Sequence, residues 1–136
     1  MMSDKPNQAR SGKPAGPTTI LVVDDSKDIR DLFHTVLQHH GYEVLLAADG
    51  ESALQVYHQH RGVIHLVIID IVMPGMSGLK LAEKFLTLRP DIKVLFVSAF
   101  FQETVLRGKL RPVDGFLVKP IPPERLITKI REMLAA

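Results

Sequence analysis

The feature that most constrains the fold is a short apolar run, HLVIID, which ends in the carboxylate of Asp70. Four consecutive apolar residues, Leu66–Ile69, precede this acid, and Pro74-Gly75 predicts a turn soon after it. An apolar run of this length between turn signals is typical of a strand covered on both faces, as in a parallel sheet. Because open α/β sheets bind ligands at the carboxyl ends of their strands, Asp70 is the first candidate functional residue.

Similar apolar runs recur along the chain, and segments of helical periodicity separate them. The expected strands are Thr19–Asp24, Tyr42–Ala48, Ile64–Asp70, Ile92–Ser98 and Val113–Lys119. The expected helices follow the capping residues Ser26, Asp49 and Ser77, with the second running to about Arg61, and the last helix opens at Pro122-Pro123. The helix expected between Phe101 and Pro112 is the weakest, because its apolar face is thin and Gly108 interrupts it. Five β–α units in succession predict an α/β fold with a parallel sheet.

Composition limits the domain organisation and the partners. Residues 1–17 contain three prolines and almost nothing apolar, so they are predicted to be a disordered tail, and residues 18–136 form one domain. The absence of cysteine excludes disulfides and thiolate metal sites and fits a cytoplasmic protein. The 17 Lys and Arg residues are scattered, so direct binding of nucleic acid is not expected. No apolar stretch is long enough to span a membrane.

Polar side chains lie at the predicted carboxyl ends of four strands. They are Asp24 and Asp25, Asp70, Ser98 and Lys119. In a parallel sheet these ends share one edge, where three carboxylates would raise one another's pKa values unless a cation neutralised them. The donors are oxygens, which favours Mg²⁺ and leaves Mn²⁺ possible. A carboxylate beside a cation, an ammonium group and a hydroxyl is typical of a phosphoryl-transfer site.

Four motifs on these strand ends resemble the receiver domain of two-component response regulators, the family of the single-domain chemotaxis regulator. The motifs are VVDD at 22–25, DIVMPGMSG at 70–78, VSA at 97–99 and DGFLVKP at 114–120. The resemblance runs from Thr19 to the carboxyl terminus. It implies a doubly wound, flavodoxin-like sheet with strand order 2-1-3-4-5. It also implies a phosphoacceptor protein that catalyses only its own phosphotransfer and dephosphorylation, rather than an enzyme with turnover.

The resemblance implies roles for the acidic residues. Asp70 corresponds to the phosphoacceptor and Asp25 to a direct ligand of Mg²⁺. Asp24 corresponds to the acid that holds metal-bound water, and Val72 would offer its backbone carbonyl to the metal.

The resemblance also implies roles for residues of the fourth and fifth strands. Ser98 corresponds to the hydroxyl residue that bonds a phosphoryl oxygen, and Lys119 to the lysine that pairs with the phosphate. The Lys119-Pro120 bond is expected to be cis, and Phe116 corresponds to the family's switch aromatic.

The implied donor is a phosphohistidine on a histidine kinase or histidine phosphotransfer protein. The new phosphate would change the face formed by the fourth helix, fifth strand and fifth helix, and so act on a downstream target that the sequence does not name. The oligomeric state expected is a monomer or a phosphorylation-dependent dimer. Val72 lies two residues after Asp70, and the aromatic Phe100 lies two residues after Ser98. These two side chains predict a dry, apolar rim around the site, which would restrict attacking water and make the acyl phosphate long-lived.

Single positions of the sequence argue against two alternative functions. A haloacid-dehalogenase-type, Mg-dependent phosphohydrolase needs a second acid two residues after the nucleophile, where this chain has Val72. An FMN carrier needs a hydroxyl- and glycine-rich loop after the first strand, where this chain has Asp24-Asp25-Ser26. A receiver used only as a scaffold is a third alternative. The chain could be a stand-alone regulator or a fragment of a longer protein.

Overall fold

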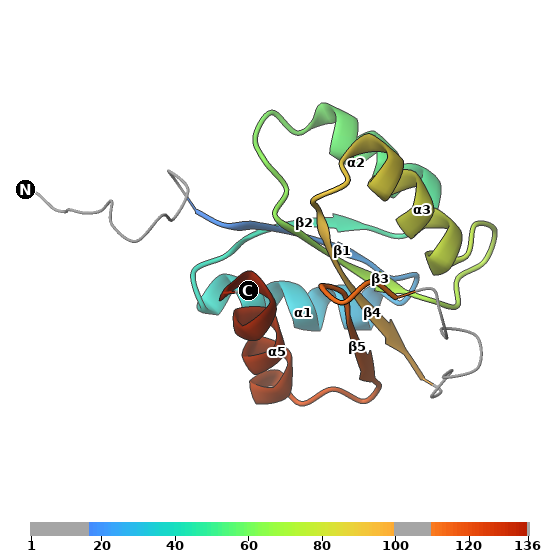
Figure 1. Cartoon of the computed structure of the whole chain (residues 1–136). Coiled ribbons are helices and arrows are strands. Elements are labelled where there is room, and N and C mark those ends of the chain that lie inside the picture. Colours follow the sequence, from blue (N-terminus) through green and yellow to red (C-terminus); the bar gives the residue numbers. More distant parts are fainter. Residues whose placement is uncertain (1–16, 100–109, 136) are drawn as a thin grey trace, which may run out of the picture.

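The computed structural model describes residues 17–99 and 110–135 (Figure 1). Within this part five parallel strands form one sheet in the order β2-β1-β3-β4-β5, which confirms the predicted doubly wound architecture. The strands are β1 (Thr19–Val23), β2 (Glu43–Ala47), β3 (Leu66–Asp70), β4 (Lys93–Ser98) and β5 (Gly115–Val118). The helices are α1 (Lys27–His39), α2 (Gly50–Gln59), α3 (Gly78–Leu88) and α5 (Pro123–Ala135).

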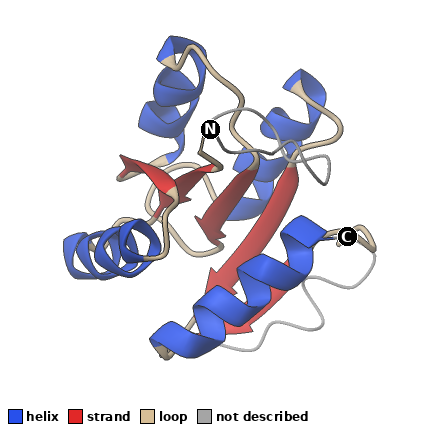
Figure 2. Cartoon of the chain, turned by 90° about the vertical axis from the view of Figure 1, so that its left-hand side faces the viewer, coloured by secondary structure: helices blue, strands red, loops and turns tan. Residues whose placement is uncertain are grey.

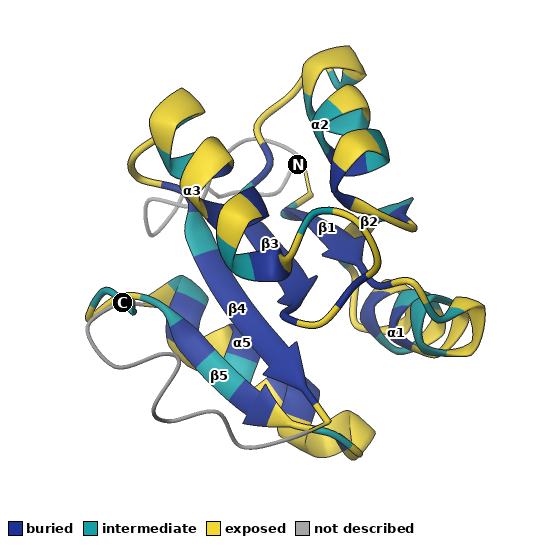
Figure 3. Ribbon diagram, turned by 90° about the vertical axis from the view of Figure 1, so that its right-hand side faces the viewer, coloured by how far each residue is buried: buried dark blue, intermediate teal, exposed yellow. Residues whose placement is uncertain are grey.

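Helices cover both faces of the sheet. The helices α1 and α5 contact each other on one face, and α2 and α3 contact each other on the opposite face (Figures 1 and 2). The central strands β1, β3 and β4 are buried almost throughout, whereas β2, at one edge of the sheet, is mostly half-buried (Figure 3). Such continuous apolar strands are what a sheet covered on both faces requires.

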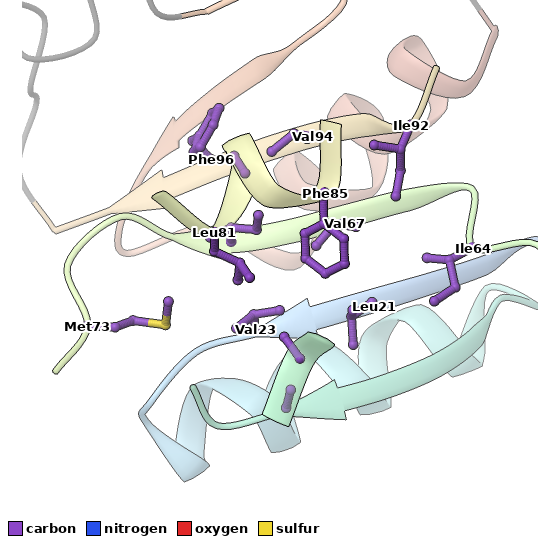
Figure 4. Packing of buried hydrophobic residues seen from close by; sticks show 14 of the residues in the cluster. Leu21, Val23, Ile64, Val67, Met73, Leu81, Phe85, Ile92, Val94 and Phe96 are labelled. Atoms are coloured by element: carbon purple, nitrogen blue, oxygen red, sulfur yellow. The ribbon is translucent and has the colours of Figure 1, made fainter. Parts of the chain in front are cut away.

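The core beneath α2 and α3 is built around one aromatic ring. Phe85 of α3 is fully buried and lies among Leu21 of β1, Val67 of β3 and Leu81 of its own helix (Figure 4). Alternate residues of the same strands, such as Ile20 and Ile68, face the second core beneath α1 and α5. Both cores therefore hold the central strands, and with them the carboxyl edge of the sheet, in place.

Side-chain caps begin three of the helices, as predicted. The hydroxyl of Ser26 accepts from the N–H of Ile29 at 3.3 Å, and the carboxylate of Asp49 accepts from the N–H of Ser52 at 2.8 Å. The hydroxyl of Ser77 accepts from the N–H of Lys80 at 3.2 Å. Each cap satisfies a backbone donor that has no partner within its helix.

The structure shortens all five predicted strands by one to three residues, and it also shortens the second helix. The helix α2 ends at Gln59 because His60 has extended backbone angles. The strand β5 begins at Gly115 rather than Val113, because residues 111–114 form a turn in which the carboxylate of Asp114 accepts from the N–H of Arg111 at 2.9 Å. The predicted tail and most of the predicted fourth helix fall on residues 1–16 and 100–109, outside the described part. No helix in the described part is long and apolar enough to cross a bilayer.

Candidate functional site

The strand ends bring the predicted polar residues to one edge of the sheet. Asp70 is the last residue of β3 and Ser98 the last of β4, while Asp24 directly follows β1 and Lys119 directly follows β5. Asp24, Asp70 and Ser98 are buried, at 1%, 5% and 0% exposure. Asp25 is exposed. One acid of the pair after β1 therefore faces the interior and the other faces solvent.

Lys119 joins the two buried acids. Its Nζ lies 2.8 Å from Oδ2 of Asp24 and 3.2 Å from Oδ2 of Asp70. Its backbone N–H donates to the carbonyl of Ser98 at 2.7 Å, and the Lys119-Pro120 bond is cis, as predicted. Burial alone would lower the pKa of Lys119, but the hydrogen bond and charge of Asp24, together with Asp70, outweigh it and raise that pKa. The lysine is therefore a fixed cation between two carboxylates.

Asp70 is a carboxylate whose ionisation is disfavoured by its surroundings. Burial, and then the charge of Asp24, raise the pKa of Asp70 above its ordinary value. The ammonium of Lys119 and the backbone N–H of Val72, which donates to Oδ1 at 3.1 Å, act in the opposite direction but do not outweigh the first two effects. An additional positive charge at this edge would therefore favour the ionised carboxylate.

The acidic residues fit a hard divalent cation. Asp24, Asp25 and Asp70 each offer a carboxylate oxygen, and these ligand atoms lie within 4.8 Å of one another. The donors are all oxygens, which is the set that Mg²⁺ prefers. The two oxygens of Asp24 already accept from Lys119 and from the N–H of Ser26, the latter at 2.9 Å. Asp25, whose carboxylate accepts no hydrogen bond from the described residues, is therefore better placed than Asp24 to act as a direct ligand.

A glycine holds α3 against the end of β3. A Cβ on Gly78 would lie 2.2 Å from the carbonyl oxygen of Asp70 and 2.8 Å from Cα of Ile71. The N–H of Gly78 donates to the carbonyl of Ile71 at 2.9 Å. Only a residue without a side chain allows this close approach of two backbones. The sequence motif includes Gly78, but its spacing gives no indication of this contact.

One neighbour of the site has no recognisable signal in the sequence. Arg30 lies in the first turn of α1, and its Nη1 donates to the backbone carbonyl of Asp24 at 2.8 Å. A basic residue six positions after an acid has no distinctive pattern on a surface helix, so this contact becomes evident only in three dimensions.

The remaining predicted residues lie around the acidic cluster. Phe116 of β5 is half-buried and packs against the core beneath α2 and α3. Val72 is 60% exposed, so an apolar side chain does project at the rim beside Asp70. Phe100, the other residue of the predicted dry rim, lies outside the described residues.

Comparison with known families agrees with this geometry. The family model described as "Response regulator receiver domain" matches residues 20–131, most of the chain. The chain belongs to this family. The receiver is 37% identical over 123 residues to the sensor kinase CckA of Brucella abortus, a match that covers 88% of this chain and 13% of that kinase. It spans about half the length of the next curated relatives, which include the response regulator SaeR of Staphylococcus epidermidis.

Solved structures agree with the family assignment over almost their whole length. The chemotaxis protein CheY4 of Vibrio cholerae matches with a TM-score of 0.78 and 31% identity, covering 87% of this chain and 99% of that one. The response regulator TrrA of Thermotoga maritima, solved in complex with Mg²⁺ and a beryllium fluoride, matches with a TM-score of 0.72 and 36% identity. That match covers 85% of this chain and 98% of TrrA. The receiver is thus a signalling module of the two-component type.

Proposed function

We propose that this receiver accepts a phosphoryl group on Asp70 from the phosphohistidine of a histidine kinase or histidine phosphotransfer protein. The observation that carries this proposal is the placement of one buried carboxylate, at the end of β3, 3.2 Å from the ammonium of Lys119 and beside two further acids. A carboxylate is a good enough nucleophile for phosphoryl transfer when it is positioned and its neighbours stabilise the charge that develops.

The transfer needs little covalent chemistry from the protein. An oxygen of the Asp70 carboxylate attacks phosphorus, the P–N bond to the donor imidazole breaks, and the bonding electron pair stays on the imidazole nitrogen. Lys119 would move its hydrogen bond from the carboxylate to a phosphoryl oxygen, since its Nζ already lies 3.2 Å from Asp70. Ser98, the last residue of β4, would bond a second phosphoryl oxygen. The role of the protein is to position these groups.

The acidic cluster would hold Mg²⁺ during this step. Asp25 and Asp70 would be its carboxylate ligands, Val72 would offer its backbone carbonyl, and Asp24 would hold a metal-bound water. The same oxygen donors would accept Mn²⁺. The bound cation would neutralise charge on the phosphoryl oxygens. Without it, two buried carboxylates and one ammonium leave the site with excess negative charge.

Phosphorylation would act as a switch. The phosphoryl group adds a charge of about −2 at the end of β3, which would draw the hydroxyl of Ser98 towards it. Phe116 would then turn inward and change the face formed by the fourth helix, β5 and α5, which a downstream target would contact as a monomer or as a phosphorylation-dependent dimer. The change is a shift between two existing states, and its extent depends on how differently the phosphoryl group interacts with each.

Hydrolysis would remain the receiver's own slow reaction. A phosphohydrolase with turnover needs an acid or base near the acyl phosphate, and two residues after Asp70 the chain has Val72, which is apolar and 60% exposed. Such a side chain neither donates nor accepts a proton, so it favours a long-lived acyl phosphate over turnover.

The test is labelling with acetyl phosphate in Mg²⁺, followed by intact mass spectrometry. Wild-type protein should gain one phosphoryl group, and Asp70→Asn should gain none. The control is Asp91→Asn. Asp91 lies outside the site, its side chain is 78% exposed, and its carboxylate pairs with Arg89. Undiminished labelling of Asp70→Asn would refute the assignment, and a loss of labelling in Asp91→Asn would show that the assay does not report on the site.

A further inference from the structure

The helix α1 carries a guanidinium that reaches back to the loop between β1 and α1. Nη1 of Arg30 donates to the carbonyl of Asp24 at 2.8 Å, and the side chain is partly buried. The backbone N–H of Arg30 donates to the carbonyl of Ser26 at 3.0 Å. The arginine therefore ties the first turn of α1 to the peptide group that joins Asp24 to Asp25.

The two acids joined by this peptide group are held very differently. The carboxylate of Asp24 is fixed by Lys119 at 2.8 Å and by the N–H of Ser26 at 2.9 Å. The exposed carboxylate of Asp25 has no hydrogen bond or ion pair with any other residue of the described ranges 17–99 and 110–135. Its direction therefore depends on the backbone that leads into it.

The carbonyl of one residue and the N–H and Cα of the next residue lie in one rigid plane. The carbonyl that accepts from Arg30 and the N–H of Asp25 belong to the same plane, so fixing the carbonyl restricts where the Cα and carboxylate of Asp25 can lie. We propose that Arg30 is a positioning residue, whose guanidinium aims Asp25 at the cation that the acidic cluster would hold. This inference rests on the proposed function, since it concerns a ligand of the proposed Mg²⁺ site.

Charge repulsion and positioning predict opposite changes in Mg²⁺ affinity when Arg30 is replaced. A guanidinium beside three carboxylates repels a divalent cation, so removing its charge would strengthen Mg²⁺ binding. Removing a group that orients a metal ligand instead weakens metal binding, typically about 10- to 100-fold. The sign of the change in Mg²⁺ affinity therefore separates positioning from simple charge repulsion.

The chain offers a charge-matched control on the same helix. Lys27 begins α1, its side chain is 77% exposed, and its Nζ pairs with Asp31 at 2.6 Å rather than with the loop. Replacing Lys27 with methionine removes one positive charge and leaves the contact between Arg30 and Asp24 intact. Arg30→Met removes the same charge together with that contact. A difference between the two variants therefore measures the contact.

The experiment is a Mg²⁺ titration of the full chain, followed through backbone amide NMR shifts of Asp25 and Ser26. We expect Arg30→Met to bind Mg²⁺ about tenfold more weakly than wild type. Lys27→Met should bind with unchanged or slightly higher affinity. Arg30→Lys should recover part of the loss, because an ammonium can still donate to the carbonyl of Asp24. Far-UV circular dichroism checks the fold, and Arg30→Gln, which is polar but shorter, repeats the test if Arg30→Met is unfolded.

Wild-type affinity, or tighter binding, in a folded Arg30→Met or Arg30→Gln would overturn the inference and leave the proposed function standing. Equal weakening in Lys27→Met would also overturn it, because the effect would then not depend on the contact between Arg30 and Asp24. A wild-type protein that shows no Mg²⁺-dependent shifts would overturn the proposed metal site, and this inference with it.

Discussion

Replacing Gly78 with alanine would place a methyl carbon 2.2 Å from the carbonyl oxygen of Asp70 and 2.8 Å from Cα of Ile71. Unstrained contacts between non-bonded carbon atoms are about 3.5 Å or longer, and contacts to oxygen are only slightly shorter. The helix α3 would therefore have to move by about 1 Å away from the end of β3. Both opposing atoms belong to the backbone, so neither can rotate out of the way.

One stabilising effect and two destabilising effects determine the change in stability. Alanine has the higher helix propensity, which would stabilise the fold by at most about 1 kcal/mol. Overpacking costs about 1–3 kcal/mol and occasionally more, and a backbone clash of this depth belongs at the upper end. Moving α3 would also weaken the hydrogen bond from Gly78 to the carbonyl of Ile71, worth about 1 kcal/mol. The free energy of unfolding should therefore fall by about 2–3 kcal/mol.

Urea unfolding measures this loss. The chain has no tryptophan, so far-UV circular dichroism is the suitable probe, and with a slope of about 2 kcal/mol per M the midpoint should fall by about 1 M or more. Labelling by acetyl phosphate should also slow, because the clash displaces the backbone that carries Asp70. An unchanged midpoint together with an unchanged labelling rate would refute the reasoning.

Gly50→Ala is the matched control for this substitution. Gly50 is likewise the first residue of a helix, but the nearest atom to its added Cβ is Sδ of Met76, at 2.7 Å. A thioether side chain is flexible and can move aside. The midpoint of Gly50→Ala should therefore change much less than that of Gly78→Ala.

Three further substitutions test other parts of the structure. Arg111→Met leaves the carboxylate of Asp114, which is 2% exposed, without its cation. The free energy of unfolding, measured in urea, should therefore fall by about 3 kcal/mol. Arg125 is exposed, so Arg125→Met should change the free energy of unfolding little. Burial and the charge of Asp24 raise the folded pKa of Asp70 above its ordinary value of 3.8, so the wild type loses stability as pH rises from that value through the folded pKa. In metal-free buffer Asp70→Asn should therefore be more stable than wild type at about pH 7 and equal to it at about pH 3, and a gain of the same size at both pH values would contradict this. Val72→Asn should shorten the lifetime of the acyl phosphate, because an amide can hold a water molecule beside phosphorus. Release of phosphate measures this lifetime, and an unchanged lifetime would contradict the dry-rim hypothesis.

The strands and the edge they share could be predicted because both follow from local patterns. Continuous apolar runs such as Leu66–Ile69 identify strands covered on both faces, and parallel topology then places the residues that follow them at one edge. The caps Ser26 and Ser77 were predictable for the same reason, since a cap acts on a backbone donor three residues away.

The start of β5 could not be predicted in this way. The guanidinium of Arg111 donates to the carbonyls of Pro90 and Ile92, at 2.8 Å and 2.6 Å, and pairs with Asp114. These contacts join segments about 20 residues apart, and no spacing in the sequence indicates them. They turn residues 111–114 away from the sheet, although the apolar Val113 favours an earlier start of the strand.

The same distinction separates the residues of the site from the residues that orient them. Topology predicts that Asp24 and Asp25 both reach the carboxyl edge, but period-two alternation says only that they point in opposite directions. Which acid turns inward depends on three contacts made by Asp24. Its carboxylate contacts Lys119, directly after β5, and the N–H of Ser26, and its carbonyl contacts Arg30 of α1. Two of these three partners come from other elements. The chemical identity of the site is therefore readable from strand ends, whereas the orientation of its ligands depends on how β5 and α1 pack against β1.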